Sequence, residues 1–311
     1  MTTQTATTPS GTAGTAGTAA PAAATRRKPR TARFYLNRAG RAALSLIAIV
    51  IGLIWVFPVY WMINSAFLSN ATLSASTPTF LPFGGSLNNF RQVLQHGNFG
   101  AALRMSLIVT LTTVVIVLLF AFLAALAISR YKFRGRKSFV LAVLFIQMLP
   151  AEGLFLAQHS MMKELGLLNS WLGVTIIYVA AVVPFTVWML RGFVAGVPAD
   201  LEEAAMVDGL SRTKAFFRIT FPLLAPGLVA SGVYAFLQAW NEFTVAFVLL
   251  DSDKKTLPLW LRGFIQQSSQ QEIDWGQVMA ASTLVAVPVI IFFLIVQGRM
   301  TSGLVAGAVK G

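Results

Sequence analysis

The sequence contains no cysteine, only two histidines and few charged residues. The missing cysteines exclude a disulfide framework, thiolate metal sites and thiol catalysis. His96 and His159 are too far apart in the chain to form a metal-ligand motif. Charged residues make up 11% of the 311 positions, against roughly 25% in an ordinary soluble domain. Apolar residues make up 56%, so most of the surface must face something other than water, and the sequence predicts an integral membrane protein.

Six stretches of the sequence are nearly free of charge, and each is long enough for the roughly 20 residues that cross a bilayer as a helix. They are 42–67, 105–129, 139–158, 165–190, 225–250 and 275–298, interrupted only by Glu152 and Glu242. None shows the alternation of membrane β-strands. The first run exceeds the apolar core of a signal peptide, which favours an uncleaved anchor. We therefore predict an all-α fold with six transmembrane helices in one membrane domain, residues 42–298.

The basic residues predict the orientation of these helices. With the N-terminus inside, the inner segments hold 18 Lys and Arg residues and the outer loops hold six, which places both termini in the cytoplasm under the positive-inside rule. Residues 1–41 carry seven basic residues and no acid. Beside an apolar run, such a cluster contacts anionic lipid and not nucleic acid. We expect a disordered cytoplasmic tail at 1–41 and a cytoplasmic C-terminal tail at 299–311 of a multi-pass protein of the cell membrane.

The cytoplasmic loop at 198–222 is the most informative segment. Pro198 suits a helix start and is followed by acids that favour the helix dipole. Gly209 is placed to end that helix in a left-handed conformation. Ser211 can cap a second short helix, which Pro222 is expected to stop. Two short helices projecting from a membrane protein are consistent with docking to a partner, although an ordinary structured loop fits equally well.

The spacing within this loop resembles the EAA loop of ABC importer permeases. The family pattern is Glu-Ala-Ala, three residues, Gly, nine residues, and Ile-x-Leu-Pro, and this chain departs from it only at Phe221. Other stretches resemble the carbohydrate branch, and specifically the second membrane subunit of maltose-type transporters, so that the resemblance covers about residues 36–311. These stretches are Arg130–Arg136, Gln147–Pro150, Leu165–Asn169, Trp240–Phe243, Asp274–Gly276 and Gly303–Gly311.

The resemblance implies a type I ABC importer permease that is not itself an enzyme. The sequence has no GxxxxGK[ST] phosphate loop, so ATP would be bound by separate ATPase subunits, and the chain would need no cofactor or metal of its own. The implied partners are a second permease subunit, the ATPases, an extracytoplasmic sugar-binding protein and membrane lipid. The implied substrate is a sugar, with trehalose, maltose-type oligosaccharides, other glycosides and even a polyol phosphate all open. Glu203 would anchor the loop in the ATPase groove, Ala204 and Ala205 would permit close approach, and Gly209 would set the angle between the helices. The coupling residues that the resemblance implies are Glu203, Ala204, Ala205, Asp208, Gly209, Ile219 and Pro222.

Polar residues inside the fifth predicted span are candidates for the translocation pathway. Tyr234, Gln238, Asn241 and Glu242 are spaced as one face of a helix. They can line a sugar pathway or form a hydrogen-bond network between helices. We favour contact with sugar for Tyr234 and Gln238, and a structural role nearer the helix seam for Asn241 and Glu242.

In the third predicted span, Gln147 and Glu152 flank Pro150, which should kink the helix beside a cavity. Glu152 is equally consistent with a substrate contact and with solvation at the outer interface. An ion-coupled secondary transporter or channel is the main alternative function, since six helices with two buried carboxylates suit it. Such a carrier would not need an EAA loop, and the internal inverted repeats that these carriers often contain are not visible in this sequence. A membrane-embedded enzyme lacks any recognisable catalytic motif.

Overall fold

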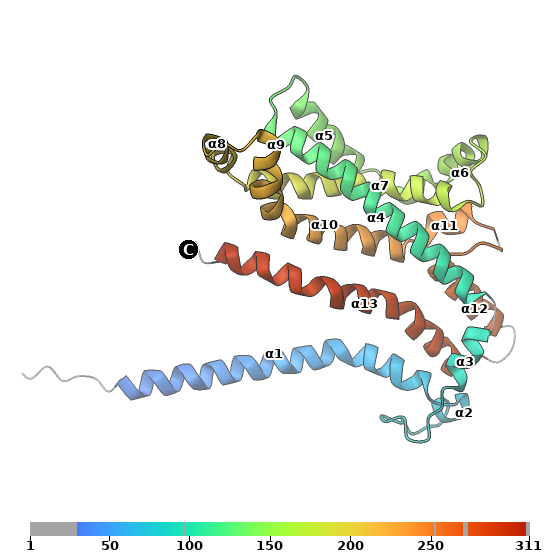
Figure 1. Ribbon diagram of the computed structural model, residues 1–311. Coiled ribbons are helices and arrows are strands. Elements are labelled where there is room, and N and C mark those ends of the chain that lie inside the picture. The colour runs from blue at the N-terminus through green and yellow to red at the C-terminus, as the bar shows by residue number, and fades with distance from the viewer. Residues whose placement is uncertain (1–29, 96–97, 252, 270–272, 309–311) are drawn as a thin grey trace, which may run out of the picture. The chain divides into compact units, whose positions relative to one another are not determined.

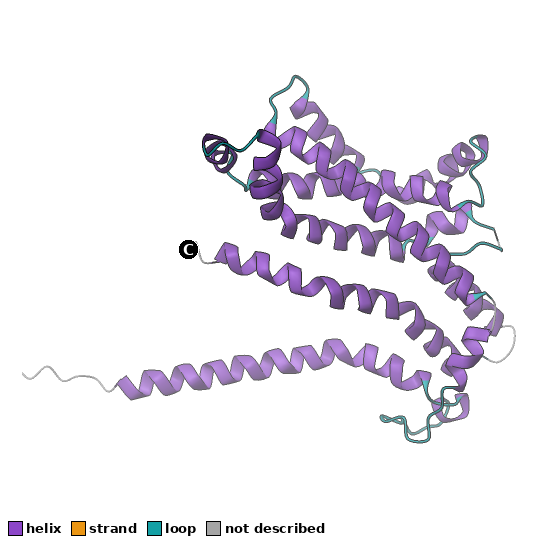
Figure 2. Cartoon of the chain, in the orientation of Figure 1, coloured by secondary structure: helices purple, strands orange, loops and turns teal. Residues whose placement is uncertain are grey.

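The computed structural model describes residues 30–95, 98–251, 253–269 and 273–308, and it is helical without strands throughout those ranges (Figure 2). Among the described residues, five helices are long and apolar enough to cross a membrane. They span Gly40–Ala66, Phe99–Arg130, Trp171–Ala195, Arg212–Asn241 and Trp275–Gly298. The predicted all-α membrane fold is confirmed. Residues 1–56 and 57–311 form two separate compact units, which are described in turn.

The first unit consists of the N-terminal part of helix α1 (Arg30–Ala66). Its apolar side chains from Leu44 to Val56 are exposed, as expected of a helix whose environment is lipid. Residues 1–29 of the predicted disordered tail lie outside the described residues, but the prediction that the tail extends to Arg41 is wrong, because α1 begins at Arg30. No proline occurs between Pro29 and Pro58, and Arg and Ala are strong helix formers, so the apolar helix can extend into the basic segment.

The second unit is built around three helices that pack side by side (Figure 1). They are α4 (Phe99–Arg130), α7 (Trp171–Ala195) and α10 (Phe221–Asn241). On α4, Ala121 and Ala125 are fully buried and pack against Leu190 of α7 and Leu224 of α10. Small residues one turn apart let membrane helices approach closely. This packing fixes the ends of α7 and α10, between which the loop at 198–222 lies.

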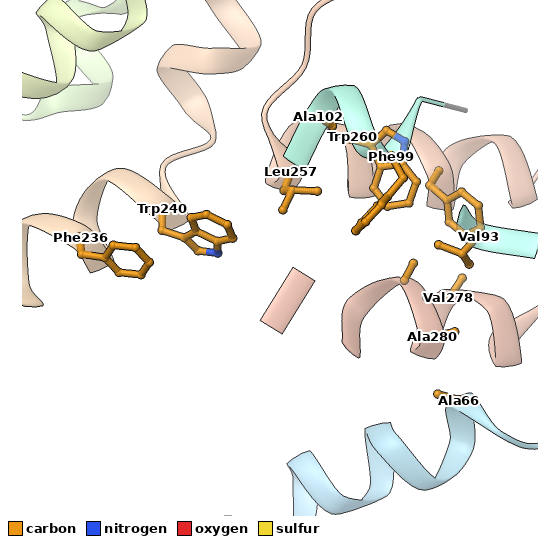
Figure 3. Close-up of a cluster of buried hydrophobic side chains, with 12 residues drawn as sticks. Ala66, Val93, Phe99, Ala102, Phe236, Trp240, Leu257, Trp260, Val278 and Ala280 are labelled. Carbon is orange, nitrogen blue, oxygen red and sulfur yellow. The ribbon is translucent and has the colours of Figure 1, made fainter. Parts of the chain in front are cut away.

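A second apolar cluster joins α4 and α10 to three other helices, α3 (Asn88–Gln95), α12 (Leu257–Ser269) and α13 (Trp275–Ala308) (Figure 3). Phe236 stacks on Trp240, with their ring centroids 5.6 Å apart, and on Phe292 at 3.9 Å. Asn89 donates to the carbonyl oxygens of Ala66 and Leu68 at 3.0 and 2.8 Å, which satisfies groups at the end of α1 and in the following turn. The short helix α2 (Asn70–Leu73) follows directly.

The third predicted span is not one helix. It is divided into α5 (Arg136–Ile146), a 3₁₀ turn at Ala151–Leu154, and α6 (Phe155–Glu164). The prediction of a continuous helix over 139–158 is therefore wrong, and the six-helix count stays a prediction. Pro150 has no backbone N–H and disfavours helical geometry in the residue before it, which accounts for a break and not merely a kink. At the other end of the chain, α13 continues past Gly298 to Ala308, so most of the predicted C-terminal tail is helical.

Candidate functional site

The loop at 198–222 contains the two short helices that its sequence predicts. The first, α8 (Asp200–Val207), has three acids in its first turn. Gly209 ends it with φ +89°, and the space that a Cβ would occupy there has no atom within 4 Å. The N–H of Leu210 donates to the carbonyl of Ala205 at 3.0 Å, and the N–H of Gly209 to that of Met206 at 3.1 Å. This pair of bonds is the Schellman motif, which depends on a left-handed residue and so confirms the predicted turn at Gly209.

The second short helix leads into α10 without a stop. Ser211 caps α9 (Arg212–Ala215) by accepting from the Lys214 N–H at 3.4 Å, as expected. A π turn then spans Phe216–Thr220 and continues directly as α10. The prediction that Pro222 stops the helix is wrong, because Pro222 lies in the first turn of α10. The N–H groups in the first turn of a helix have no partner within that helix, so a proline, which lacks an N–H, is tolerated there. The π turn before Pro222 also shifts the hydrogen-bond register, so the proline ring does not disrupt it.

The residues for which the motif predicts a coupling role lie partly at the surface and partly in the interior. Glu203, Ala204, Asp208, Gly209 and Pro222 are exposed, whereas Ile219 is half-buried and Ala205 is buried. Ala205 therefore permits close packing within this chain and not against a partner. Apolar residues that the motif does not include widen the exposed surface of α8, and Val207 is 88% exposed.

The residue missed by sequence reasoning is Glu202, directly before the motif. Its Oε1 accepts a hydrogen bond from Thr220 Oγ1 at 2.6 Å and lies 3.5 Å from Arg130 Nη2 at the end of α4. A hollow of about 460 Å³ is lined by Arg130 and Glu202, and also by Arg212 and Phe216. No sequence pattern links Glu202 to Arg130, which is 72 positions away. The only signal in the sequence is that an acidic residue lies in a loop between two apolar helices.

The polar face predicted on the fifth span is divided by the end of α10. The helix ends at Asn241, and Glu242 is extended, with φ −68° and ψ 129°, so Glu242 does not share the face of Tyr234 and Gln238. Its carboxylate accepts from the N–H groups of Val245 and Ala246 at 2.8 and 3.2 Å. It thereby caps the short helix α11 (Thr244–Leu249). This is a local role, and the predicted place of the Glu242 side chain in a seam between helices stays a prediction.

The remaining pathway candidates on α10 differ in their surroundings. Tyr234 is half-buried, with its ring 4.6 Å from that of Phe185. Gln238 and Asn241 are exposed. The Asn241 amide donates to the Leu237 carbonyl of its own helix at 2.9 Å, so the expected place of Asn241 in a helix seam is not what the structure shows. Contact of this face with a sugar stays a prediction.

Gln147 and Glu152 lie at the break in the third segment. Gln147 is exposed and forms the C-cap of α5. Glu152 belongs to the 3₁₀ turn, and its side chain lies outside the described residues. Within the described ranges, no three acidic or histidine side chains lie close enough together to hold a metal ion.

Comparisons with known proteins agree with this geometry. The family "Binding-protein-dependent transport system inner membrane component" matches residues 118–304. The diacetylchitobiose uptake system permease protein DasC of Streptomyces coelicolor is 39% identical over 273 residues, covering 88% of this chain and 98% of that protein. The trehalose/maltose transport system permease protein MalG of Thermococcus litoralis is 37% identical, covering 87% and 97%. Both relatives are named as permease proteins of transport systems.

Among solved structures, a chain of a bacterial ABC transporter that imports the acidic polysaccharide alginate superposes with a TM-score of 0.68. It is 25% identical, and the match covers 88% of this chain and 99% of that one. The family match, the apolar helices and the likeness to this transporter lead to one conclusion. The chain is a multi-pass membrane protein that belongs to the family of inner membrane components of binding-protein-dependent transport systems.

Proposed function

We propose that this chain is a permease subunit of an ATP-driven importer and forms half of the translocation pathway for a di- or oligosaccharide. Its partners in this proposal are a second permease subunit, ATPase subunits that bind the ATP, and an extracytoplasmic sugar-binding protein. The substrate class is supported by relatives named for diacetylchitobiose and for trehalose and maltose. The matches extend over nearly the full length of these relatives. They therefore support the proposal that this chain, like its relatives, is the permease subunit.

The observation that carries the proposal is the helix pair α8–α9. It projects an exposed surface with Glu203, Ala204 and Val207, and it is continuous with α10 through the π turn. A lever needs a surface that a partner can push and a stiff connection to the helices that move. This pair has both features. An exposed apolar side chain such as Val207 also fits burial in a groove of a partner.

The proposal places α8 and both chain termini in the cytoplasm, where ATP is available. Termini on one side require an even number of spans. Five helices qualify as spans among the described residues, so α5, the 3₁₀ turn and α6 together would make the sixth crossing. Backbone that is not helical is tolerated at membrane depth where protein or a water-filled cavity surrounds it, so the break at Gln147–Pro150 is expected to face the pathway or the partner permease.

The alternative of an ion-coupled carrier has less support. Such a carrier requires a carboxylate that is free to bind and release an ion. The Glu242 carboxylate is engaged with the first turn of α11. The open face of α10, with Tyr234, Gln238 and Asn241, offers hydroxyl and amide groups that suit sugar hydroxyls.

The experiment compares two glycines with the same local geometry at different places. Gly209 and Gly166 both have positive φ, +89° and +68°, with open space around them. Both end a helix through the same pair of Schellman bonds, since Leu167 donates to Met162 at 2.8 Å and Gly166 to Lys163 at 3.1 Å. Valine at either position therefore imposes a similar backbone strain.

This chain, co-expressed with its ATPase, its second permease subunit and its binding protein, would be reconstituted as the full complex in vesicles. Uptake of labelled sugar would be measured with and without ATP. We expect Gly209→Val to abolish ATP-driven uptake while Gly166→Val keeps most of it, at equal yields of complex. Uptake by the wild type that depends on an ion gradient and not on ATP would contradict the proposed function, and normal uptake by Gly209→Val would contradict the role of the loop.

A further inference from the structure

Three side chains from separate elements meet at the base of the coupling loop. Arg130 comes from the last turn of α4, Glu202 from α8, and Thr220 from the π turn before α10. Glu202 Oε1 joins them, because it accepts from Thr220 Oγ1 at 2.6 Å and lies 3.5 Å from Arg130 Nη2. The pair of Arg130 with Glu202 is the one ion pair that the described residues form among themselves.

The surroundings make this contact stronger than a surface pair. Thr220 is fully buried, and the side chains of Arg130 and Glu202 are 19% and 17% exposed. A short hydrogen bond from a hydroxyl to a carboxylate is among the stronger ones in proteins, and an ion pair shielded from water is screened less than an exposed one. Arg130 Nε and Nη2 are buried and make no hydrogen bond within the described ranges, so Glu202 is the acid that balances this guanidinium there.

Apolar packing holds α8 only weakly. Ala205 is the only buried residue of α8, and its small side chain contributes little buried area. The orientation of α8 relative to α4 and α10 therefore depends strongly on Glu202. The π turn contributes to this arrangement, since the Phe221 N–H bonds back to the Phe216 carbonyl across five residues and Thr220, the last residue of the turn, bonds Glu202. Single π turns within helices are frequent at functional sites.

We propose that Arg130, Glu202 and Thr220 form a positioning network that fixes α8 to α4 and α10, so that movement of the coupling loop is transmitted to the transmembrane helices. The inference rests on the proposed function. It divides the two neighbouring acids of α8: the exposed Glu203 is available to the ATPase, whereas Glu202 holds the loop to its own chain. All three members of the network are positioning residues, and none needs to touch ATP or sugar.

The first test measures coupling in the full reconstituted complex, as sugar molecules imported per ATP hydrolysed. The variants are Glu202→Ala and Thr220→Val, with Asp200→Ala as the matched control, because Asp200 is an exposed acid of the same helix. Coupling free energies between sites are typically worth about five-fold or more. We expect Glu202→Ala to lower the sugar-to-ATP ratio by at least about five-fold while ATP hydrolysis persists, and Asp200→Ala to leave the ratio unchanged.

A conservative variant keeps this test decisive if Glu202→Ala assembles poorly. Glu202→Gln retains an oxygen that accepts from Thr220 but loses the charge that pairs with Arg130, so its ratio should lie between that of the wild type and that of Glu202→Ala. A network with only a structural role would lower the yield of complex and leave the ratio of the surviving complex at the wild-type value. That outcome would overturn the proposal.

The second test locks the network covalently, which is feasible because the chain has no native cysteine. The double variant Glu202→Cys with Thr220→Cys should be poorly coupled. A short, reducible cross-linker between the two thiols should restore the ratio, and reduction should abolish it again. Each single cysteine variant, treated in the same way, is the control and should not recover. A cross-linked complex that hydrolyses ATP but stays uncoupled would show that α8 must move relative to α10, against the proposal.

Hydrogen exchange separates a failure of this inference from a failure of the proposed function. In the purified complex, amides of α8 should exchange faster in Glu202→Ala than in Asp200→Ala, whether or not sugar is transported. If the wild type shows no ATP-driven uptake, the proposed function fails, and exchange still decides whether Glu202 holds α8. If the wild type transports sugar, and Glu202→Ala changes neither the hydrogen exchange of α8 nor the sugar-to-ATP ratio, only the proposed network is wrong.

Discussion

Glu202 and Glu242 are both partly buried, yet they serve different purposes because the groups that pair with them come from different distances along the chain. The partners of Glu202 lie 18 and 72 positions away: Thr220 in the π turn donates a hydrogen bond, and Arg130 at the end of α4 forms an ion pair. The carboxylate of Glu242 accepts from backbone N–H groups only three and four residues ahead. Glu202 is a tertiary link, and Glu242 is a local helix cap.

This difference reverses the ranking that sequence position favours. An acid inside a membrane span is costly and is taken by default as functional, whereas an acid in a loop between spans attracts no attention. Here the acid at the end of the span is used to satisfy the backbone of α11, while the loop acid joins three elements. The role of a carboxylate follows from the groups that pair with it, and those become visible only when the helices are packed.

The largest expected effect comes from breaking the long-range pair. Arg130→Met leaves the Glu202 carboxylate without its counter-charge, and we expect a loss of about 1–3 kcal/mol, below the roughly 3–5 kcal/mol of fully buried pairs because both side chains are about a fifth exposed. Combining Arg130→Met with Glu202→Gln should recover part of the loss. Thermal unfolding of the purified complex measures both. Additive losses in the double variant would show that the two side chains are not coupled.

A smaller and more local effect is expected at the cap. Glu242→Ala removes the acceptor of two backbone N–H groups, which should cost about 1–2 kcal/mol, the range of helix N-caps. Faster hydrogen exchange should be confined to α11. Glu242→Gln keeps an acceptor oxygen and serves as the control. If Glu242→Gln gave a normal yield of complex but no uptake, the carboxylate would belong to the transport pathway after all.

The sequence predicts the parts of this fold that depend on local chemistry. The apolar runs give the positions of the spans because each can satisfy its own backbone within a helix. The loop helices are also predictable, since Gly209 and Ser211 act on neighbouring backbone groups only. The break before Pro150 and the passage of the helix through Pro222 are harder to foresee. Pro150 follows a break between helices, whereas Pro222 lies in a continuous helix behind a π turn. Which of the two occurs depends on the packing around the proline.

The candidate site was predictable only in its motif residues. The face of Tyr234 and Gln238 follows from helical spacing, but the same spacing wrongly includes Glu242, because the end of α10 at Asn241 is not marked by glycine or proline. The pairing of Arg130 with Glu202 depends on how α4, α7 and α10 pack together. No periodicity records a contact of that range.

A still smaller effect is expected from Tyr178, which contacts the backbone of Glu242. The Tyr178 hydroxyl donates to the Glu242 carbonyl oxygen at 3.3 Å. Tyr178→Phe removes one long hydrogen bond without changing the ring packing, so we expect a loss of about 0.5–1 kcal/mol in thermal unfolding of the complex. Uptake should be unchanged. A loss as large as that of Glu242→Ala would show that Tyr178 holds the whole junction between α10 and α11.

The smallest effect is expected at Thr113, which is the matched partner of Thr220. Both threonines are fully buried, but Thr113 Oγ1 has no hydrogen-bond partner among the described residues, whereas Thr220 Oγ1 bonds Glu202. Valine has nearly the shape of threonine without its hydroxyl, so Thr113→Val removes an unpaired polar group from the interior. Its stability should stay within about 0.5 kcal/mol of the wild type or rise slightly, while Thr220→Val loses stability because the carboxylate of Glu202 gives up its strongest donor. Unfolding of the two variants side by side measures the contrast. Equal losses would mean that the hydroxyl of Thr220 contributes only volume and that Glu202 does not hold the coupling loop through it.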